Sequence, residues 1–496
     1  MYLDPGEHLC PYCLIKRLAT HPKILGKIVG ALVGLGGGQL GGFASTSHIA
    51  LYPFLKGLRE LMRSPSCERV KDAVEKVDKG LASSLQQKGW LERLKGLDVE
   101  DVFFTEEAEA RKRVQELRRV MEECGRDMLD PAYTRINTYY AIVRANGDYI
   151  GELFAGRLNQ ETIGVDYMEL QASSMEDIPD AEASKFARLL REGANNNVRV
   201  VERILRSELG RAADEVKRAA VSVCEMLSRV RSEGRLPVTP AYHAALSRAL
   251  MITALKDIEA VREVKGEVIY AGGDDFLAFV PSAFALHLVR KTRSCYSVGD
   301  SGYRGFHRVG SGLFASLGRA SRSYSVVFGH FKYPMSRLLE LSYELVESAK
   351  RARMTYGALS KSKDMLLLAY SPRGGGVKAK STIPLSSEEA MRLLTMLVSS
   401  VEDGLLSHSL AYDLLRELGR YEGWMQQFEA LGSILSYVLS RNLMVEGAEP
   451  SAKLLAFRLR GLAGCMIFGD EGRRGLLEQV ASALWATIAA LRGQEP

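Results

Sequence analysis

The feature that most constrains the fold is a glycine-aspartate turn between two apolar runs that are rich in β-forming residues. The turn is Gly272-Gly273-Asp274-Asp275, and residues 268–270 and 276–280 flank it. β-Branched and aromatic residues favour strands, whereas glycine and aspartate favour the tight turn that joins two strands. The sequence therefore predicts a β-hairpin with two adjacent carboxylates at its tip.

Two adjacent carboxylates concentrate negative charge, which is unfavourable unless a cation neutralises it. Magnesium prefers oxygen ligands and takes substrate phosphates as its other partners. The glycines allow positive φ angles and leave room for a phosphate to approach the backbone. This turn therefore predicts a site for Mg²⁺ or Mn²⁺ and a phosphate ester, and a surface hairpin whose acids face water is the alternative.

A second acid-bearing segment lies upstream. Residues 139–143 form a β-rich run that leads to Asn146-Gly147-Asp148, a strong turn signal. If this strand lies beside the hairpin, Asp148 joins Asp274 and Asp275 at one edge of a sheet. Three carboxylates from two strands would suit a palm that uses two metal ions for phosphoryl transfer.

The remaining pattern is mainly helical, in a chain of ordinary globular composition, with 46% hydrophobic and 25% charged residues. Helical periodicity covers residues 49–128, 181–231, 240–264, 335–351 and the chain from 386 onward, with a break near 195–197. Strands are expected at 324–330, 365–370 and 377–382. We expect an α+β fold whose sheet carries helices on one face, in domains 1–130, 131–385 and 386–496.

Composition also limits the compartment and the partners. The chain has 66 basic and 60 acidic residues, and this small excess of positive charge is compatible with phosphate contacts. Of seven cysteines only Cys10 and Cys13 form a close pair, which is typical of a reducing compartment rather than of a disulfide framework. No signal peptide or stretch of about 20 apolar residues is evident. We expect a cytoplasmic protein with no membrane contact.

Several segments, in order, resemble the large signature subunit of type III CRISPR effector complexes, and most closely its III-B (Cmr-type) branch. They are residues 9–17 (LCPYCLIKR), 45–50 (STSHIA), 146–151 (NGDYIG), 270–275 (YAGGDD) and 329–334 (GHFKYP). The ordered set covers most of the chain and is more specific than any single motif.

The resemblance implies a ferredoxin-like nucleotidyl-cyclase or polymerase palm, flanked by helical domains, that converts ATP into cyclic oligoadenylate when target RNA is bound. Asp274 and Asp275 would hold the metal ions, with Asp148 as the upstream ligand. The nucleotide-binding residues would be Gly272, Gly273, Asn146, Gly147, His330 and Lys332. The implied partners are other type III subunits, guide RNA and target RNA.

The chain departs from the family pattern at three places. Asn146 stands where the family usually has an acid, so one charged ligand is replaced by an amide. Cys10 and Cys13 are half of the usual zinc site, and tetrahedral Zn²⁺ would need further ligands from His8, His21, His48 or another chain. The sequence has no His-Asp dipeptide, so we expect no HD nuclease, and a separate N-terminal half is a further candidate partner.

Two rival functions remain open. The first is a scaffold subunit that binds guide RNA and sister subunits without turnover, and the second is a stand-alone cyclase or polymerase outside CRISPR. Residues 36–41 match the spacing of a dinucleotide-binding glycine loop but lack its strand–helix–strand context. Four arginines between the hairpin and the next strand are candidates for a phosphate path, namely Arg304, Arg308, Arg319 and Arg322.

Overall fold

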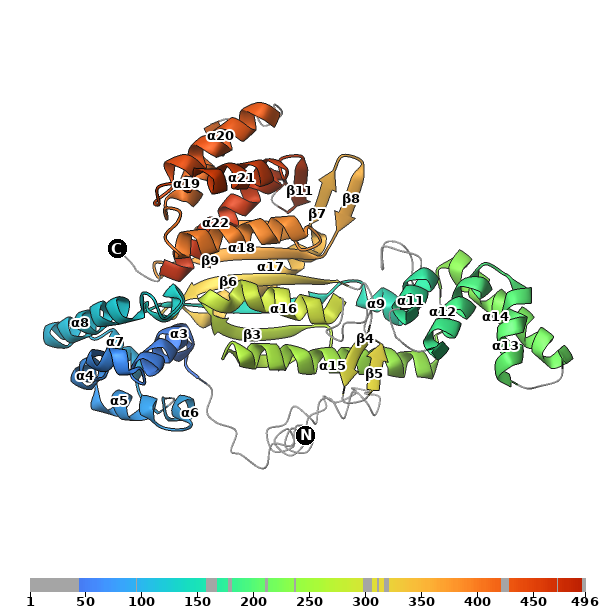
Figure 1. Ribbon diagram of the computed structural model, residues 1–496, viewed down its shortest axis with the longest axis horizontal. Helices are drawn as coiled ribbons and strands as arrows, with labels where there is room; N and C mark the ends of the chain where they lie inside the picture. Colours follow the sequence, from blue (N-terminus) through green and yellow to red (C-terminus); the bar gives the residue numbers. More distant parts are fainter. Residues whose placement is uncertain are drawn as a thin grey trace, which may run out of the picture.

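The computed structural model describes a mixed sheet enclosed by helices (Figure 1). It describes residues 44–492 except 95, 158–166, 177–180, 210–212, 236–237, 298–305, 310–311, 316–320, 421–427 and 471. The expected Cys10–Cys13 pair and the glycine-rich stretch near residue 36 lie outside these residues.

The central sheet has six strands in the order β10-β9-β6-β1-β3-β2. Their bounds are β1 (Tyr139–Gly147), β2 (Glu267–Ala271), β3 (Phe276–Pro281), β6 (Arg322–His330), β9 (Met365–Ser371) and β10 (Ala379–Pro384). Strand β1 is antiparallel to both β3 and β6, and β6 is parallel to β9. The α+β class and the hairpin expected from the sequence are confirmed.

Helices cover both faces of this sheet, so the expectation of helices on one face is wrong. One face packs against α3 (Thr46–Leu61) and α17 (Met335–Arg351). The other packs against α15 (Pro240–Glu263), α16 (Ala285–Ser297) and the C-terminal helices. Strand β1 is buried along nearly its whole length, which explains its near-continuous apolar sequence.

Two further helical groups lie at opposite ends of the sheet (Figure 1). The first contains α4 (Glu68–Val77), α5 (Lys79–Gln86), α6 (Trp90–Leu94), α7 (Val99–Phe103) and α8 (Ala108–Gly125). The second contains α9 (Ile150–Phe154), α11 (Tyr167–Glu176), α12 (Ala181–Ala194), α13 (Val198–Leu209) and α14 (Ala213–Glu233). The break expected near residue 195 separates α12 from α13.

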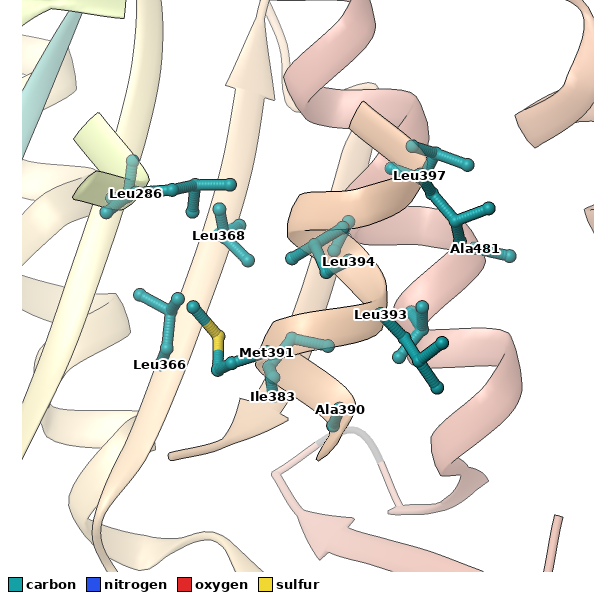
Figure 2. Close-up of a cluster of buried hydrophobic side chains, with 14 of the residues drawn as sticks. Leu286, Leu366, Leu368, Ile383, Ala390, Met391, Leu393, Leu394, Leu397 and Ala481 are labelled. Carbon is teal, nitrogen blue, oxygen red and sulfur yellow. The ribbon is translucent and has the colours of Figure 1, made fainter. Parts of the chain in front are cut away.

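The C-terminal helices share a core with the central sheet rather than forming a separate one. They are α18 (Glu388–Glu402), α19 (Leu410–Arg420), α20 (Phe428–Arg441), α21 (Glu449–Arg460) and α22 (Leu476–Arg492). Helix α18 directs Met391 and Leu394 toward β9, and Leu393 and Leu397 toward α22 (Figure 2). Two faces of α18 therefore join the sheet to the last helix of the chain.

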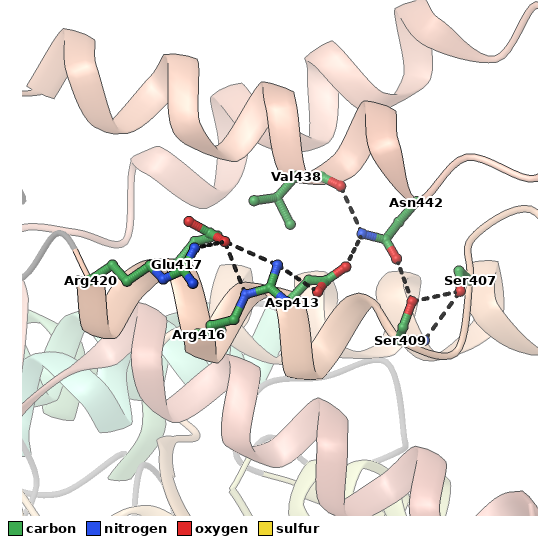
Figure 3. Close-up of polar contacts among 8 residues, drawn as sticks. All are labelled: Ser407, Ser409, Asp413, Arg416, Glu417, Arg420, Val438 and Asn442. Atoms are coloured by element: carbon green, nitrogen blue, oxygen red, sulfur yellow. Dashed lines mark hydrogen bonds and ion pairs between the residues drawn. The ribbon is translucent and has the colours of Figure 1, made fainter.

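A buried polar network fixes α19 to the end of α20 (Figure 3). The Asn442 side-chain amide donates to Asp413 Oδ2 at 3.0 Å and to the Val438 carbonyl at 2.9 Å. The Ser409 hydroxyl donates to the Asn442 side-chain oxygen at 2.9 Å. Because the donors and acceptors of Asn442 are satisfied, this buried amide specifies the helix pairing at little cost.

Two small sheets were not predicted from the sequence. Strands β7 (Arg353–Tyr356), β8 (Leu359–Ser362), β11 (Cys465–Gly469) and β12 (Gly472–Gly475) form a four-stranded sheet, and β4 (Phe306–Val309) pairs with β5 (Gly312–Ala315). Pairing of β7 with β11 joins the centre of the chain to its C-terminal part. Such short strands of mixed polarity carry little periodic signal.

Helix α3 approaches the backbone near Tyr133 so closely that only glycine fits at the contact. A β-carbon at Gly57 would lie 2.1 Å from the Tyr133 carbonyl oxygen. We expect Gly57→Ala to lower the free energy of unfolding by about 1–3 kcal/mol, measured by urea denaturation. Gly419→Ala, in an open position of α19, is the matched control and should not destabilise the protein. Equal stability of the two variants would contradict this contact.

Candidate active site

The turn between β2 and β3 has a backbone that depends on glycine. The Gly272 amide donates to the Asp275 carbonyl at 2.9 Å, and Gly273 has a φ of +104°. Residues with a β-carbon rarely adopt such a φ. The two glycines therefore allow Asp274 and Asp275 to follow each other at the tip of the hairpin.

The turn lies directly beside the end of β1, as the sequence analysis expected. Ala145 of β1 is in register with Phe276 of β3. A β-carbon at Gly147 would lie 2.8 Å from the β-carbon of Asp274. Gly147 therefore brings the end of β1 into contact with the acidic turn, and the adjacency of the two segments is confirmed.

The Asp148 carboxylate, however, is directed into the protein. Asp148 is 1% exposed. Its two oxygens accept hydrogen bonds from the Ser321 hydroxyl at 2.6 Å, the Ser323 hydroxyl at 2.8 Å and the Asp364 amide at 2.9 Å. Burial raises the pKa of Asp148, and these three hydrogen bonds oppose that rise. The carboxylate anchors the end of β1 to β6 and to the turn before β9.

The expected convergence of three carboxylates on metal ions is therefore not found. Within the described part of the chain, no group of three or more acidic, histidine or cysteine side chains is arranged to hold a metal ion. The reason is that the Asp148 carboxylate points to Ser321 and Ser323 at the start of β6 and is held there by their hydroxyls. Its role as a metal ligand does not follow from this geometry.

The two acids of the turn differ in their surroundings. The Tyr270 hydroxyl donates to Asp275 Oδ2 at 2.8 Å. The pKa of Asp274 is raised, first by burial and then by the neighbouring charge of Asp275, while its own backbone amide, Arg322 and Lys350 lower it. Negative charge at this turn is thus only partly compensated by the protein.

Asn146 lies one residue before Gly147 on β1, in register with Ser323 of β6. It is half-buried. Because side chains alternate along a strand, Asn146 shares a face with Arg144, whose guanidinium contacts Ser342 of α17. The amide therefore lies on the α17 side of the sheet, close to the end of β1.

Two lysines that the sequence analysis missed lie near these acids. Lys363 sits between β8 and β9 with a φ of 62°, and its ammonium is 3.6 Å from the centre of the Tyr149 ring. Burial lowers the pKa of Lys363, the charge of Asp148 raises it, and Lys350 at the end of α17 lowers it. Both lysines therefore lie within electrostatic reach of the acidic edge. Only the fold brings them there.

His330 and Lys332 lie at the opposite end of the sheet from the turn, which corrects their assignment to a nucleotide site. In the antiparallel register of β1 and β6, Gly147 faces Arg322 while Tyr139 faces His330. His330 is buried and stacks on Phe331, and the Lys332 ammonium pairs with Glu100 of α7 at 3.0 Å. The Lys332 side chain therefore joins this end of the sheet to α7, and the His330 ring packs against Tyr139 of β1.

The other expected contacts are also changed or lie outside the described residues. Arg322 is wholly buried and pairs with Asp257, so it lines no phosphate path. Arg304, Arg319 and the Arg308 side chain fall outside the described part of the chain. His48, a candidate zinc ligand, has both ring nitrogens in hydrogen bonds, to Ser45 and to the Leu94 carbonyl.

In the described residues, no helix is long and apolar enough to span a membrane.

Comparison with known families matches the centre of the chain. Residues 223–356 match the model described as Cas10/Cmr2, second palm domain. This range contains the acidic turn, β6 and α17, and it begins after β1.

Two curated relatives are Cmr2 subunits of CRISPR systems. The Saccharolobus solfataricus protein is 27% identical over 490 residues, which cover 83% of this chain and 44% of that protein. The Pyrococcus furiosus protein is 30% identical over 143 residues, which cover 29% of this chain and 14% of that protein. The chain thus spans less than half the length of these relatives.

Two solved structures share the fold. The apo type III-B Cmr-beta complex contains a chain with a TM-score of 0.61 at 21% identity, over 99% of this chain and 52% of that one. In the same complex bound to cognate target RNA, the matching chain has a TM-score of 0.61 at 22% identity, over 99% of this chain and 53% of that one.

Removal of one serine tests the anchoring of Asp148. We expect Ser323→Ala to lower the free energy of unfolding by about 1–3 kcal/mol at neutral pH, because a buried carboxylate loses a hydrogen bond. The folded-state pKa of Asp148 is already raised, and the substitution raises it further. Ionised Asp148 therefore opposes folding more strongly, and the loss shrinks as the pH falls and Asp148 is protonated.

Urea denaturation at pH 7 and pH 5 measures this difference. Ser433→Ala, which removes an exposed hydroxyl bonded to Glu429 in α20, is the control and should be nearly neutral at both pH values. A Ser323→Ala effect that is larger at pH 5 than at pH 7 would contradict this account, because protonation of Asp148 can only reduce the loss.

Proposed function

Because this chain belongs to the Cas10/Cmr2 family of large CRISPR subunits, we propose that it converts ATP into cyclic oligoadenylate within a type III-B effector complex. One observation carries the proposal. The acidic tip of the β2–β3 hairpin lies against the end of β1, with two lysines in electrostatic reach. Such an edge can accept a triphosphate together with its cation.

The carboxylates fit a metal ion that is shared with the substrate. Asp274 and Asp275 supply oxygen ligands, and burial and the neighbouring charge of Asp275 disfavour the charge of Asp274. Magnesium commonly uses one or two carboxylates and completes its coordination with waters and phosphates. With Asp148 bonded to two serines and one amide, this donor set suits a cation that arrives with ATP. When bound, Mg²⁺ or Mn²⁺ would neutralise charge on the transferring phosphoryl group.

The chain's own residues would bind and orient the nucleotide. Gly272 and Gly273 keep side chains away from the turn, so a phosphate can approach the backbone. Lys350 supplies positive charge near Asp274, and Lys363 supplies it near Asp148. The low pKa of Lys363 relative to that of an ordinary lysine reflects burial, and a phosphate would favour its charged form.

The partners follow from the relatives. A similar chain is part of a complex that binds cognate target RNA. We propose sister subunits, guide RNA and target RNA as partners of this chain. Formation of cyclic oligoadenylate from ATP would then depend on assembly of these parts.

A scaffold without turnover is the second candidate, and two observations favour it. Asn146 stands where the resemblance implies an acid, and no group of three potential metal ligands forms in the described residues. In this case the chain would bind RNA and sister subunits while the acidic turn remained inactive.

Turnover by the assembled complex separates these functions. With ATP, Mg²⁺ or Mn²⁺ and matched target RNA, we expect a cyclic product resolved by chromatography. The double variant Asp274→Asn/Asp275→Asn should reduce its rate by roughly 100-fold or more, because several kcal/mol of charge stabilisation are lost.

Lys332→Gln serves as the control at the far end of the sheet, and it should retain activity within about threefold. Absence of product from the unaltered complex, with RNA binding intact, would favour the scaffold. Full activity of the double variant would exclude the acidic turn as the active site.

A further inference from the structure

A fully buried arginine lies directly beneath the acidic turn. Arg322, the first residue of β6, is 0% exposed. Arginine is almost never fully buried unless it is paired, because removal of its charge from water is costly. The contacts of this side chain therefore need a physical explanation.

The guanidinium joins a helix to the turn. One of its terminal nitrogens donates to Asp257 Oδ2 on α15 at 2.7 Å, and the other donates to the Gly273 carbonyl at 2.8 Å. Gly273 is the residue with the positive φ, so its carbonyl direction sets the path of the chain into Asp274. Arg322 thus holds the peptide that immediately precedes the first acid.

Aromatic rings complete the surroundings of Arg322. Its guanidinium carbon lies 4.0 Å from the centre of the Tyr296 ring and 5.7 Å from that of Phe276. The Tyr296 hydroxyl would lie 2.7 Å from a β-carbon at Gly147. The ring that stacks on Arg322 therefore also contacts the end of β1.

A buried ion pair of this kind is expected to contribute little to the stability of the core. Asp257 Oδ1 and Arg322 Nε are buried and have no hydrogen-bond partner among the described residues. Replacement of a buried ion pair by apolar side chains of similar volume is often neutral or stabilising. An incompletely satisfied pair beneath a candidate active site therefore suggests a role other than stability.

The residues on either side of Arg322 hold the other acidic element. The hydroxyls of Ser321 and Ser323 bond to Asp148, whereas Arg322 bonds to Gly273. This division follows from the alternation of side chains along a strand. Three consecutive residues thus hold the end of β1 and the tip of the hairpin at a fixed separation.

We propose that Arg322 and Asp257 form a positioning pair that fixes the Gly273 carbonyl and thereby sets the placement of the Asp274 and Asp275 carboxylates. This inference rests on the proposed function, because the carboxylates need a fixed position only if they bind a cation and nucleotide. A shift of about 1 Å in a reacting group can cost roughly 100-fold in rate. Loss of the pair should therefore affect turnover more than folding.

The test replaces the pair by apolar residues in the full chain, assembled as for the turnover assay. The variant is Asp257→Leu/Arg322→Met. As the control, Arg351→Gln/Asp470→Asn removes an exposed ion pair between the last residue of α17 and the residue after β11. At saturating metal, we expect kcat to fall about 10- to 100-fold, with KM for ATP changed by less than about threefold. The Mg²⁺ concentration for half-maximal turnover should rise.

Hydrogen exchange of the turn supplies a readout that does not require activity. The Gly272 amide is bonded within the turn, so loss of the Gly273 anchor should speed its exchange by about tenfold. Exchange in β1 and β3 should stay unchanged, and the control variant should match the unaltered protein in every readout.

Each outcome decides the proposal. If the double variant folds and has an unaltered kcat, metal requirement and hydrogen-exchange rate at the Gly272 amide, the positioning role is overturned. The proposed function is not affected by that result. An unaltered protein without turnover overturns the proposed function, and the local exchange rate still decides the positioning role. If the double variant does not fold, Asp257→Asn, which keeps the side-chain shape, is judged by the same two readouts.

Discussion

The pairing of β1 with β3 on one side and β6 on the other is the constraint on which the site depends. Because both neighbours run antiparallel to β1, the end of β1, the start of β3 and the start of β6 meet at one edge of the sheet. The acidic turn, Asp148 and the Ser321–Ser323 segment are thereby brought together from distant parts of the sequence. Packing on both faces of β1 fixes this register, since a shift by one residue would turn each of its side chains to the opposite face and disrupt both packed interfaces.

Charge at that edge is divided between two kinds of site. Asp148 is enclosed by hydrogen-bond donors of the protein, whereas Asp274 and Asp275 repel each other and remain partly exposed. The buried guanidinium of Arg322 bonds to the turn, the charge of Lys350 acts on Asp274, and that of Lys363 acts on Asp148. The geometry therefore favours a cation that is bound jointly by the turn and by phosphate oxygens.

The hairpin and the long helices could be predicted from sequence because their signals are local. Glycine and aspartate specify the turn, and residues 240–264 show a single helical period. The placement of His330 and Lys332 could not be predicted, since β6 has nine residues at about 3.3 Å each and carries them roughly 26 Å from the turn. Lys363 and the partners of Asp148 were missed because segments far apart in sequence bring them to the edge. The domain boundaries expected at 130 and 385 remain predictions.

Binding of Mn²⁺, followed by electron paramagnetic resonance, tests the central claim most directly. Two carboxylates alone should bind Mn²⁺ weakly, and addition of ATP should tighten binding by about tenfold or more, with the gain lost in Asp274→Asn/Asp275→Asn. Tight binding of Mn²⁺ without ATP, unaffected by that double substitution, would show that the cation is held elsewhere. It would contradict a site shared between the acidic turn and the nucleotide.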